Sequence, residues 1–157
     1  MKLLFKQRFF SWLDSYDVYY EDGSVAYTVE GRLAWGHKLV ISGPDGRELA
    51  TVREEVLTFL PRFTLYLGER EIGQVRKELT FFSPSFRMDC RGWQVDGDFL
   101  QWDYTVSDAQ GELIAVISKK LFQWTDTYVL DVEEPENALY VLMIALAIDA
   151  ARCSQGS

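Results

Sequence analysis

Residues 138–148 read Ala-Leu-Tyr-Val-Leu-Met-Ile-Ala-Leu-Ala-Ile, an uninterrupted apolar run near the end of the chain. Pro135 and Glu136, just before it, are typical of a helix start, because proline is tolerated in the first turn and a carboxylate stabilises the positive end of the helix dipole. We therefore predict a helix over Glu136–Ala151. A helix that is apolar on every side has no face for water, so the rest of the protein must enclose it.

A membrane is the other environment in which such a helix is stable. A membrane-spanning helix needs about 20 apolar residues, whereas this run is roughly half as long and is followed by Asp149 and Arg152. We therefore expect a buried core helix and not a transmembrane one. Residues 152–157, which end in Ser-Gln-Gly-Ser, are expected to form a frayed tail.

The residues before the helix predict a series of short antiparallel strands. Apolar and polar residues alternate, and turn-forming stretches such as Glu21-Asp22-Gly23-Ser24 separate the alternating segments. About twelve strands of roughly five to seven residues fit between the turns. Their centres lie near Leu4, Val18, Ala26, Leu39, Ala50, Leu65, Ile72, Met88, Gln94, Asp103, Val116 and Val129.

The strand region also contains an internal repeat. Leu39–Leu67 aligns with Tyr104–Val132 without a gap at an offset of 65 residues, and Val52–Leu65 aligns with Val75–Met88 at an offset of 23. Three copies of one unit are therefore visible, each a strand, a bend with an aromatic residue or a proline, and a second strand. Alternation and turn glycines occur in any β-protein, but the length of the ungapped run favours a genuine structural repeat.

The strand count predicts a sheet large enough to surround the helix. About twelve strands spaced ~4.8 Å apart and tilted ~40° close into a barrel roughly 24 Å across. The lining side chains then leave room for one helix, which is about 10 Å in diameter. We therefore predict a mainly β fold in which residues 1–157 form a single domain, a closed antiparallel barrel around the buried hydrophobic C-terminal helix.

Charge and cysteine content restrict the partners and the compartment. The 16 Lys and Arg residues are outnumbered by 24 Asp and Glu, and the formal net charge of −8 disfavours nucleic-acid binding. Lys2, Lys6 and Arg8 interrupt the stretch in which a signal peptide needs an apolar region. We therefore expect a cytoplasmic protein in which Cys90 and Cys153 stay reduced and form no disulfide.

Several segments resemble the LURP-one-related family. They are Ile117-Ser118-Lys119-Lys120-Leu121, Thr127-Tyr128-Val129 and the closing Ala145-Leu146-Ala147-Ile148-Asp149, within a body of repeated hairpins. That family belongs to the Tubby C-terminal-like superfamily, whose fold is a twelve-stranded barrel around a hydrophobic C-terminal helix. The resemblance covers essentially the whole chain and implies this fold.

The functional implications of the resemblance concern lipids. Tubby domains bind membrane phosphoinositides through a basic patch, and phospholipid scramblases are described as distant relatives. No phosphoinositide-binding residue of the Tubby domains matches this chain position by position. The net charge of −8 is a further departure from a strongly basic membrane binder.

No residue pattern in the sequence predicts catalysis, a metal site or a cofactor. His37 is the one histidine, which excludes a multi-histidine metal site, and its place after Trp35-Gly36 predicts a loop or turn. Cys90 lies in a predicted strand and is typical of a half-buried structural thiol. Glu54 and Glu55 point to opposite faces of a strand and are typical of surface charges. A hydrolase that uses Cys90 or a carboxylate pair is the least favoured alternative.

One group of basic residues is a candidate ligand-binding site. The repeat places Arg53, Arg76, Lys77, Lys119 and Lys120 at the same end of equivalent strands. If those strands are neighbours, their charges form an anion-binding patch. Salt bridges to nearby glutamates at the barrel rim are the competing interpretation. The predicted ligand-binding residues are Arg76, Lys77, Lys119 and Lys120.

Together these features predict a non-catalytic binding or scaffold domain that contacts a phospholipid headgroup or another anionic ligand at the barrel surface. Such a protein is peripheral to the membrane if lipid is the ligand. The alternative is an intracellular protein-interaction or structural domain with no small ligand. A barrel filled by its own helix has no free central cavity, so any partner has to bind at the rim or on the outer wall.

Overall fold

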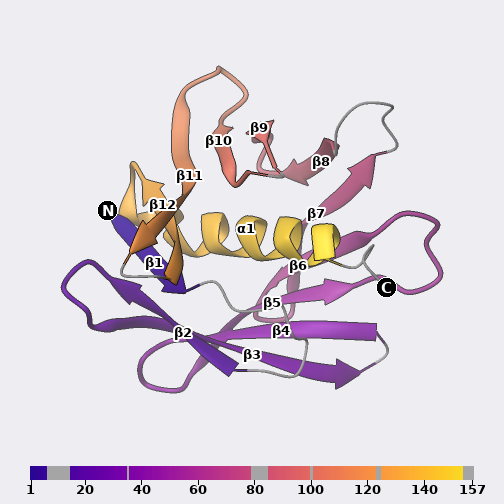
Figure 1. Ribbon diagram of the computed structural model, residues 1–157. Helices are drawn as coiled ribbons and strands as arrows, with labels where there is room; N and C mark the ends of the chain where they lie inside the picture. Colours follow the sequence, from indigo (N-terminus) through magenta and orange to yellow (C-terminus); the bar gives the residue numbers. More distant parts are fainter. Residues whose placement is uncertain (7–14, 35, 79–84, 100, 123–124, 154–157) are drawn as a thin grey trace.

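Within the residues that the structure describes, twelve strands form one antiparallel sheet that curls around a single α-helix (Figure 1). The structure is a computed structural model that describes residues 1–6, 15–34, 36–78, 85–99, 101–122 and 125–153. The strands are β1 Lys2–Lys6, β2 Ser15–Tyr20, β3 Val25–Ala34, β4 Gly36–Ser42, β5 Glu48–Glu54, β6 Arg62–Leu67, β7 Arg70–Glu78, β8 Ser85–Cys90, β9 Gln94–Asp98, β10 Asp103–Ser107, β11 Leu113–Phe122 and β12 Thr125–Val132. A short 3-10 helix, η1 Pro135–Asn137, precedes the helix α1 Ala138–Cys153.

Each of these strands contains one of the predicted centres, which confirms the strand positions. The predicted lengths are wrong for several of them, since β3 and β11 have ten residues, β7 has nine and β12 has eight. For β3, the extra length arises because the ladder continues as far as the pair formed by Ala34 and Gly36 at the β3–β4 turn. Gly36 makes this tight turn possible with a φ of 85°.

Helix α1 fills the barrel as predicted, and residues 141–151 are all buried. The helix runs two residues beyond its predicted end, so Arg152 and Cys153 are helical and do not belong to a frayed tail. The last turn is anchored because the Arg152 guanidinium lies 3.5 Å from the Asp149 carboxylate and 5.1 Å from the centre of the Trp102 ring. The rest of the predicted tail, residues 154–157, lies outside the described residues.

The three repeats predicted from the sequence share one hydrogen-bond register, which confirms them as a structural repeat. In β5–β6 and β11–β12, residues 50 and 67 pair in the same way as residues 115 and 132. In β7–β8 the equivalent residues 73 and 90 pair. The turns agree as well, because the amide N of Gly43 donates to Arg47 O and that of Asp108 donates to Glu112 O, both at 2.9 Å.

The barrel is nearly closed, and its seam lies between β8 and β9. The strand order β8-β7-β6-β5-β4-β3-β2-β1-β12-β11-β10-β9 leaves these two as the edges of the sheet, with no ladder between their described residues. Side chains bridge the seam, since the Phe86 and Phe99 rings lie 4.9 Å apart and almost perpendicular. The prediction of a closed barrel is therefore right for the arrangement of the strands, but side-chain contacts replace the last ladder.

Two glycines allow neighbouring strands to approach closely on either side of this seam. Gly73 in β7 pairs with Cys90 in β8, and Gly97 in β9 pairs with Tyr104 in β10. A Cβ atom at Gly73 would meet the Asp89 carbonyl oxygen and lie 2.6 Å from Cys90 Cβ, and one at Gly97 would lie 2.8 Å from Tyr104 Cβ. A side chain at either position has no room, so glycine permits the close approach of the neighbouring strand.

A polar group lies inside the barrel near the C-terminal end of α1. Asp149 is buried there, and its carboxylate interacts electrostatically with the phenol groups of Tyr16 and Tyr104. Burial first, and the Asp149 carboxylate second, raise the pKa of both phenols far above the usual value of 10. These tyrosines are therefore held in their neutral form by the fold.

We expect Tyr16 and Tyr104 to ionise only when the protein unfolds. Because the folded pKa lies above the unfolded value of 10, the stability that these residues contribute is present below pH 10 and is lost as the pH rises above it. An alkaline titration that follows phenolate absorbance should show a late phase coincident with the loss of near-UV circular dichroism. Tyr104→Phe should shrink that late phase, and ionisation of every tyrosine before unfolding would contradict the prediction.

Candidate functional site

The predicted binding residues lie near one end of the barrel but do not form a single patch. Arg76 and Lys77 lie in β7, and Lys119 and Lys120 lie in β11. In the order of the sheet, β8, β9 and β10 separate these two strands across the seam. The repeat therefore correctly places the four residues at the same ends of parallel-running strands, but those strands are not neighbours.

Within each of these two pairs of basic residues, one side chain faces outward and the other faces inward. Val75 is fully buried in the core, so its strand neighbour Arg76 faces outward and Lys77 faces inward at the rim. Burial lowers the pKa of Lys77. The same alternation directs Lys119 inward and Lys120 outward.

Arg76 belongs to a row of basic residues on the outer wall of the barrel. The ladder places it directly opposite Arg62 in β6 on one side and Arg87 in β8 on the other. Further along the sheet, Lys38 in β4 is directly opposite Arg53 in β5. Five adjacent strands thus each contribute one cation to the same face.

The two parts of this row are continuous. Arg53 pairs with Thr64 of β6, which lies two residues from Arg62 on the same face, so the two arginines are diagonal neighbours about 7–8 Å apart. We call the set Lys38, Arg53, Arg62, Arg76 and Arg87 the basic wall. Across four intervals of ~4.8 Å it extends roughly 19 Å around the barrel.

The cations of the basic wall have no acidic partner among the residues that the structure describes. Arg32 in β3, just beyond the wall, shows the contrast, because its guanidinium lies 3.1 Å from Glu30 and 2.8 Å from Glu48. Like charges directly opposite each other destabilise a sheet. The basic wall therefore carries an electrostatic cost that ion pairs among the described residues do not offset.

Several carboxylates lie close to the basic wall on the same face. Glu78 and Asp89 lie two residues beyond Arg76 and Arg87 on their strands. Glu55 follows β5 and accepts a hydrogen bond from the Thr64 hydroxyl at 2.7 Å. The wall is thus bordered by acids without being paired to them.

Acidic residues gather on the other side of the seam. Strand β9 exposes Asp96 and Asp98, and Asp98 is directly opposite the exposed Asp103 of β10. Strands β9 and β10 thus carry acidic residues and no lysine or arginine, whereas β4–β8 carry charges of both signs, including the basic wall.

The surroundings of His37 and Cys90 are typical of residues with a structural role. His37 lies within β4 and not in a loop, since the tight turn at Gly36 lets the strand begin at once, and His37 Nδ1 is 2.7 Å from Glu54 Oε2. Cys90 is a free, buried thiol, and burial raises its pKa, which lowers its reactivity. Among the residues with described positions, no group of three or more His, Cys, Asp and Glu side chains is arranged to hold a metal ion.

Sequence reasoning missed Lys38, Arg62 and Arg87 as members of one site. The available signal was the hairpin register, since aligning β6, β7 and β8 through their turns places Arg62, Arg76 and Arg87 side by side. The repeat alignment alone compares equivalent strands and does not reveal which residues face one another across a ladder.

The fold and its helix define the class, a β-barrel domain built around its own C-terminal helix. The chain belongs to the LURP-one-related family, whose profile matches residues 1–149. It is similar to the uncharacterized protein YxjI of Bacillus subtilis (strain 168), with 29% identity over 150 residues that cover 95% of this chain and 92% of that protein. These matches confirm the family that the sequence resembles.

The fold is also that of a solved structure. An X-ray structure of a protein from Arabidopsis thaliana matches with a TM-score of 0.62 and 14% identity, over 94% of this chain and 90% of that one. In the described ranges, no helix combines the length and the apolar character needed to cross a membrane.

Proposed function

We propose that this domain is a non-catalytic binding module that takes an anionic ligand on the basic wall, with a phospholipid headgroup as the leading ligand. The observation that carries the proposal is the row of unneutralised cations across five adjacent strands of a protein whose net charge is −8. The LURP-one-related family is placed in the same superfamily as the Tubby domains, which bind phosphoinositides through a basic patch, and this relationship supports lipid as the ligand.

The chemistry of the basic wall suits phosphate. A guanidinium group donates two parallel hydrogen bonds to phosphate oxygens, and four of the wall residues are arginines. The wall extends over roughly 19 Å, which is wide enough to contact several headgroups at once. Each basic residue near an anionic membrane contributes about 1 kcal/mol, so the wall as a whole gives appreciable attraction at low salt. A bound anion would also relieve the repulsion between directly opposed cations.

The test is co-sedimentation with vesicles that contain phosphatidylserine or a phosphoinositide, compared with phosphatidylcholine vesicles. Replacing Arg62, Arg76 and Arg87 together by Gln should weaken binding to anionic vesicles at low salt roughly 100-fold, because three cations are lost. The same variant should be at least as stable as the parent in thermal unfolding, since opposed like charges are removed.

The matched control replaces Lys77, Lys119 and Lys120 by Gln, which changes the net charge by the same amount. We expect this variant to retain most of the binding. A larger loss in the control than in the arginine variant would place the site at the barrel rim. Absence of binding to any anionic vesicle at low salt would contradict the proposal, and a protein partner recovered without lipid would favour the protein-interaction alternative.

A further inference from the structure

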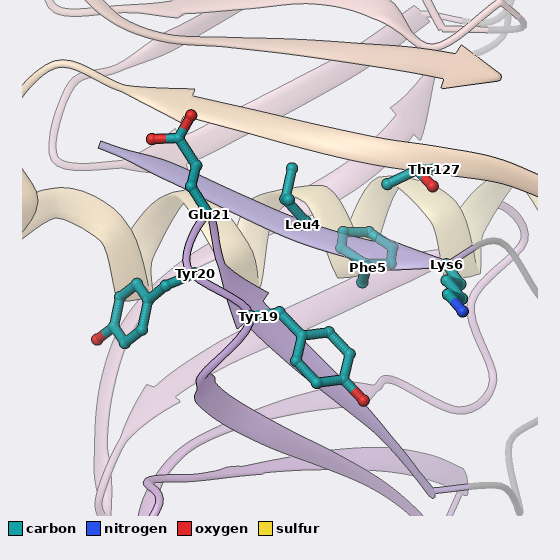
Figure 2. A pocket seen from close by; sticks show the side chains of 8 residues that line it. Leu4, Phe5, Lys6, Tyr19, Tyr20, Glu21 and Thr127 are labelled. Carbon is teal, nitrogen blue, oxygen red and sulfur yellow. The ribbon is translucent and has the colours of Figure 1, made fainter. Parts of the chain in front are cut away.

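A cleft opens on the outer wall where β1 and β2 separate. Their described residues pair at two positions, Leu3 with Tyr20 and Leu4 with Tyr19, whereas β1 pairs with β12 along its whole length. At this point lies a pocket of about 270 Å³ (Figure 2). It is lined by Leu4, Phe5, Lys6, Tyr19, Tyr20, Glu21, Gly23 and Thr127, mainly through their apolar surface.

A second, smaller pocket of about 150 Å³ adjoins the first. Lys6 and Tyr19 line both pockets, and Ser15, Tyr16 and Asp17 complete the smaller one. Polar and apolar atoms both line this second space. The cleft therefore has an apolar compartment beside a polar one, and Lys6 stands at their junction.

The charges around the cleft indicate the sign of its ligand. The Glu21 carboxylate lies 3.7 Å from the Lys2 ammonium group, and the Asp17 carboxylate accepts a hydrogen bond from the Thr28 hydroxyl at 2.8 Å. Lys6 is exposed and makes no ion pair with any residue whose position is described. Glu21 is offset by Lys2, and Asp17 is hydrogen-bonded to Thr28 but keeps its negative charge, so Lys6 at the junction is the group that an anionic head can contact.

We propose that this cleft binds a small amphiphilic anion, a carboxylate attached to a medium-length alkyl chain or to an aryl group. A cavity of about 150 Å³ accommodates benzene, so the larger pocket has space for a chain of about eight carbons or an aryl group with a short linker. The apolar part lies over Leu4 and between the Tyr19 and Tyr20 side chains, which Figure 2 shows on the β2 side of β1. The carboxylate contacts the Lys6 ammonium group.

The test is titration calorimetry with octanoate and 1-octanol, which share a chain length and differ in head charge. Octanoate should bind the parent protein about three- to five-fold more tightly than octanol, the gain expected for an exposed ion pair. Lys6→Gln should remove that difference and leave octanol binding unchanged. Leu4→Gln should weaken both ligands about ten-fold, because apolar contact is lost.

The control variant is Arg47→Gln, which removes an exposed cation from the β4–β5 turn and should leave both affinities unchanged. A parallel titration with 4-phenylbutyrate decides between alkyl and aryl carboxylates. The proposal is overturned by the absence of saturable octanoate binding, by equal octanoate affinity in the parent and Lys6→Gln proteins, or by octanol binding as tightly as octanoate. Thermal unfolding of each variant shows that the fold is retained.

Discussion

Replacing Ile144 by Asp is expected to abolish the folded state. Ile144 lies in the middle of α1 with 0% of its side chain exposed, inside the curled sheet. Burying an unpaired carboxylate costs several kcal/mol in addition to the lost apolar contact. Because a domain of this size has a total stability of about 5–15 kcal/mol, this one change is sufficient to unfold it. Far-UV circular dichroism and the loss of a cooperative urea transition measure the effect.

Two further variants make this result specific to the helix core. Leu33→Asp introduces the same side chain at an exposed position, where 66% of the leucine is accessible, and should change the stability by no more than about 0.5 kcal/mol. Ile144→Val removes one buried methylene and should cost about 1 kcal/mol. An Ile144→Asp protein with the urea midpoint of the parent would show that α1 is not the core on which the sheet depends.

Gly73→Ala is expected to cost at least about 3 kcal/mol, more than a typical overpacked position. The added methyl group would meet the Asp89 carbonyl oxygen and lie 2.6 Å from Cys90 Cβ and 2.8 Å from Cys90 Cα. Much of this obstruction is backbone, which no change of side-chain conformation relieves. Strand β8 would have to move away from β7 and toward β9 across the seam. Urea unfolding gives the loss of stability, and hydrogen exchange at residues 85–90 locates it.

Gly46→Ala is the control, because at Gly46 an added methyl group causes backbone strain but meets no neighbouring atom. Gly46 has a φ of 81°, but a Cβ atom there meets nothing within 4 Å, so its cost is the 1–2 kcal/mol or so of a left-handed conformation. Gly73 has no positive φ and is limited by space alone. Equal effects of the two substitutions would contradict a close approach of β8 at Gly73.

The fold was predictable because its strongest signals are local. The apolar run at 138–148 requires enclosure, and alternation with turn residues locates every strand of the described chain. The strand lengths and the position of the seam were not predictable. They depend on how tightly each hairpin turns and on which two strands remain without a ladder between them. Gly73 and Gly97 permit the close approach of their neighbouring strands, but from the sequence alone a glycine in a strand can equally mark a bulge.

The candidate site was predictable only in part. Repeat alignment finds Arg76 and places the basic residues at one end of the barrel, because equivalent strands run in the same direction. It does not give the strand order, which separates β7 from β11, and it does not give the ladder partners Arg62 and Arg87. The cleft between β1 and β2 has no sequence signal, since it arises where a ladder that alternation would extend stops at Leu4.

Helix α1 follows all of the described strands in the chain, and β1 pairs with β12, the last strand before it. During synthesis the strands therefore leave the ribosome with their apolar inner faces uncovered, and the first strand has no partner on one side until β12 appears. Domains usually fold as units once their chain has emerged, and this one lacks its core until residue 153 has left the exit tunnel. The described strands therefore cannot enclose their core until α1 has emerged, and until then their apolar inner faces are open to aggregation.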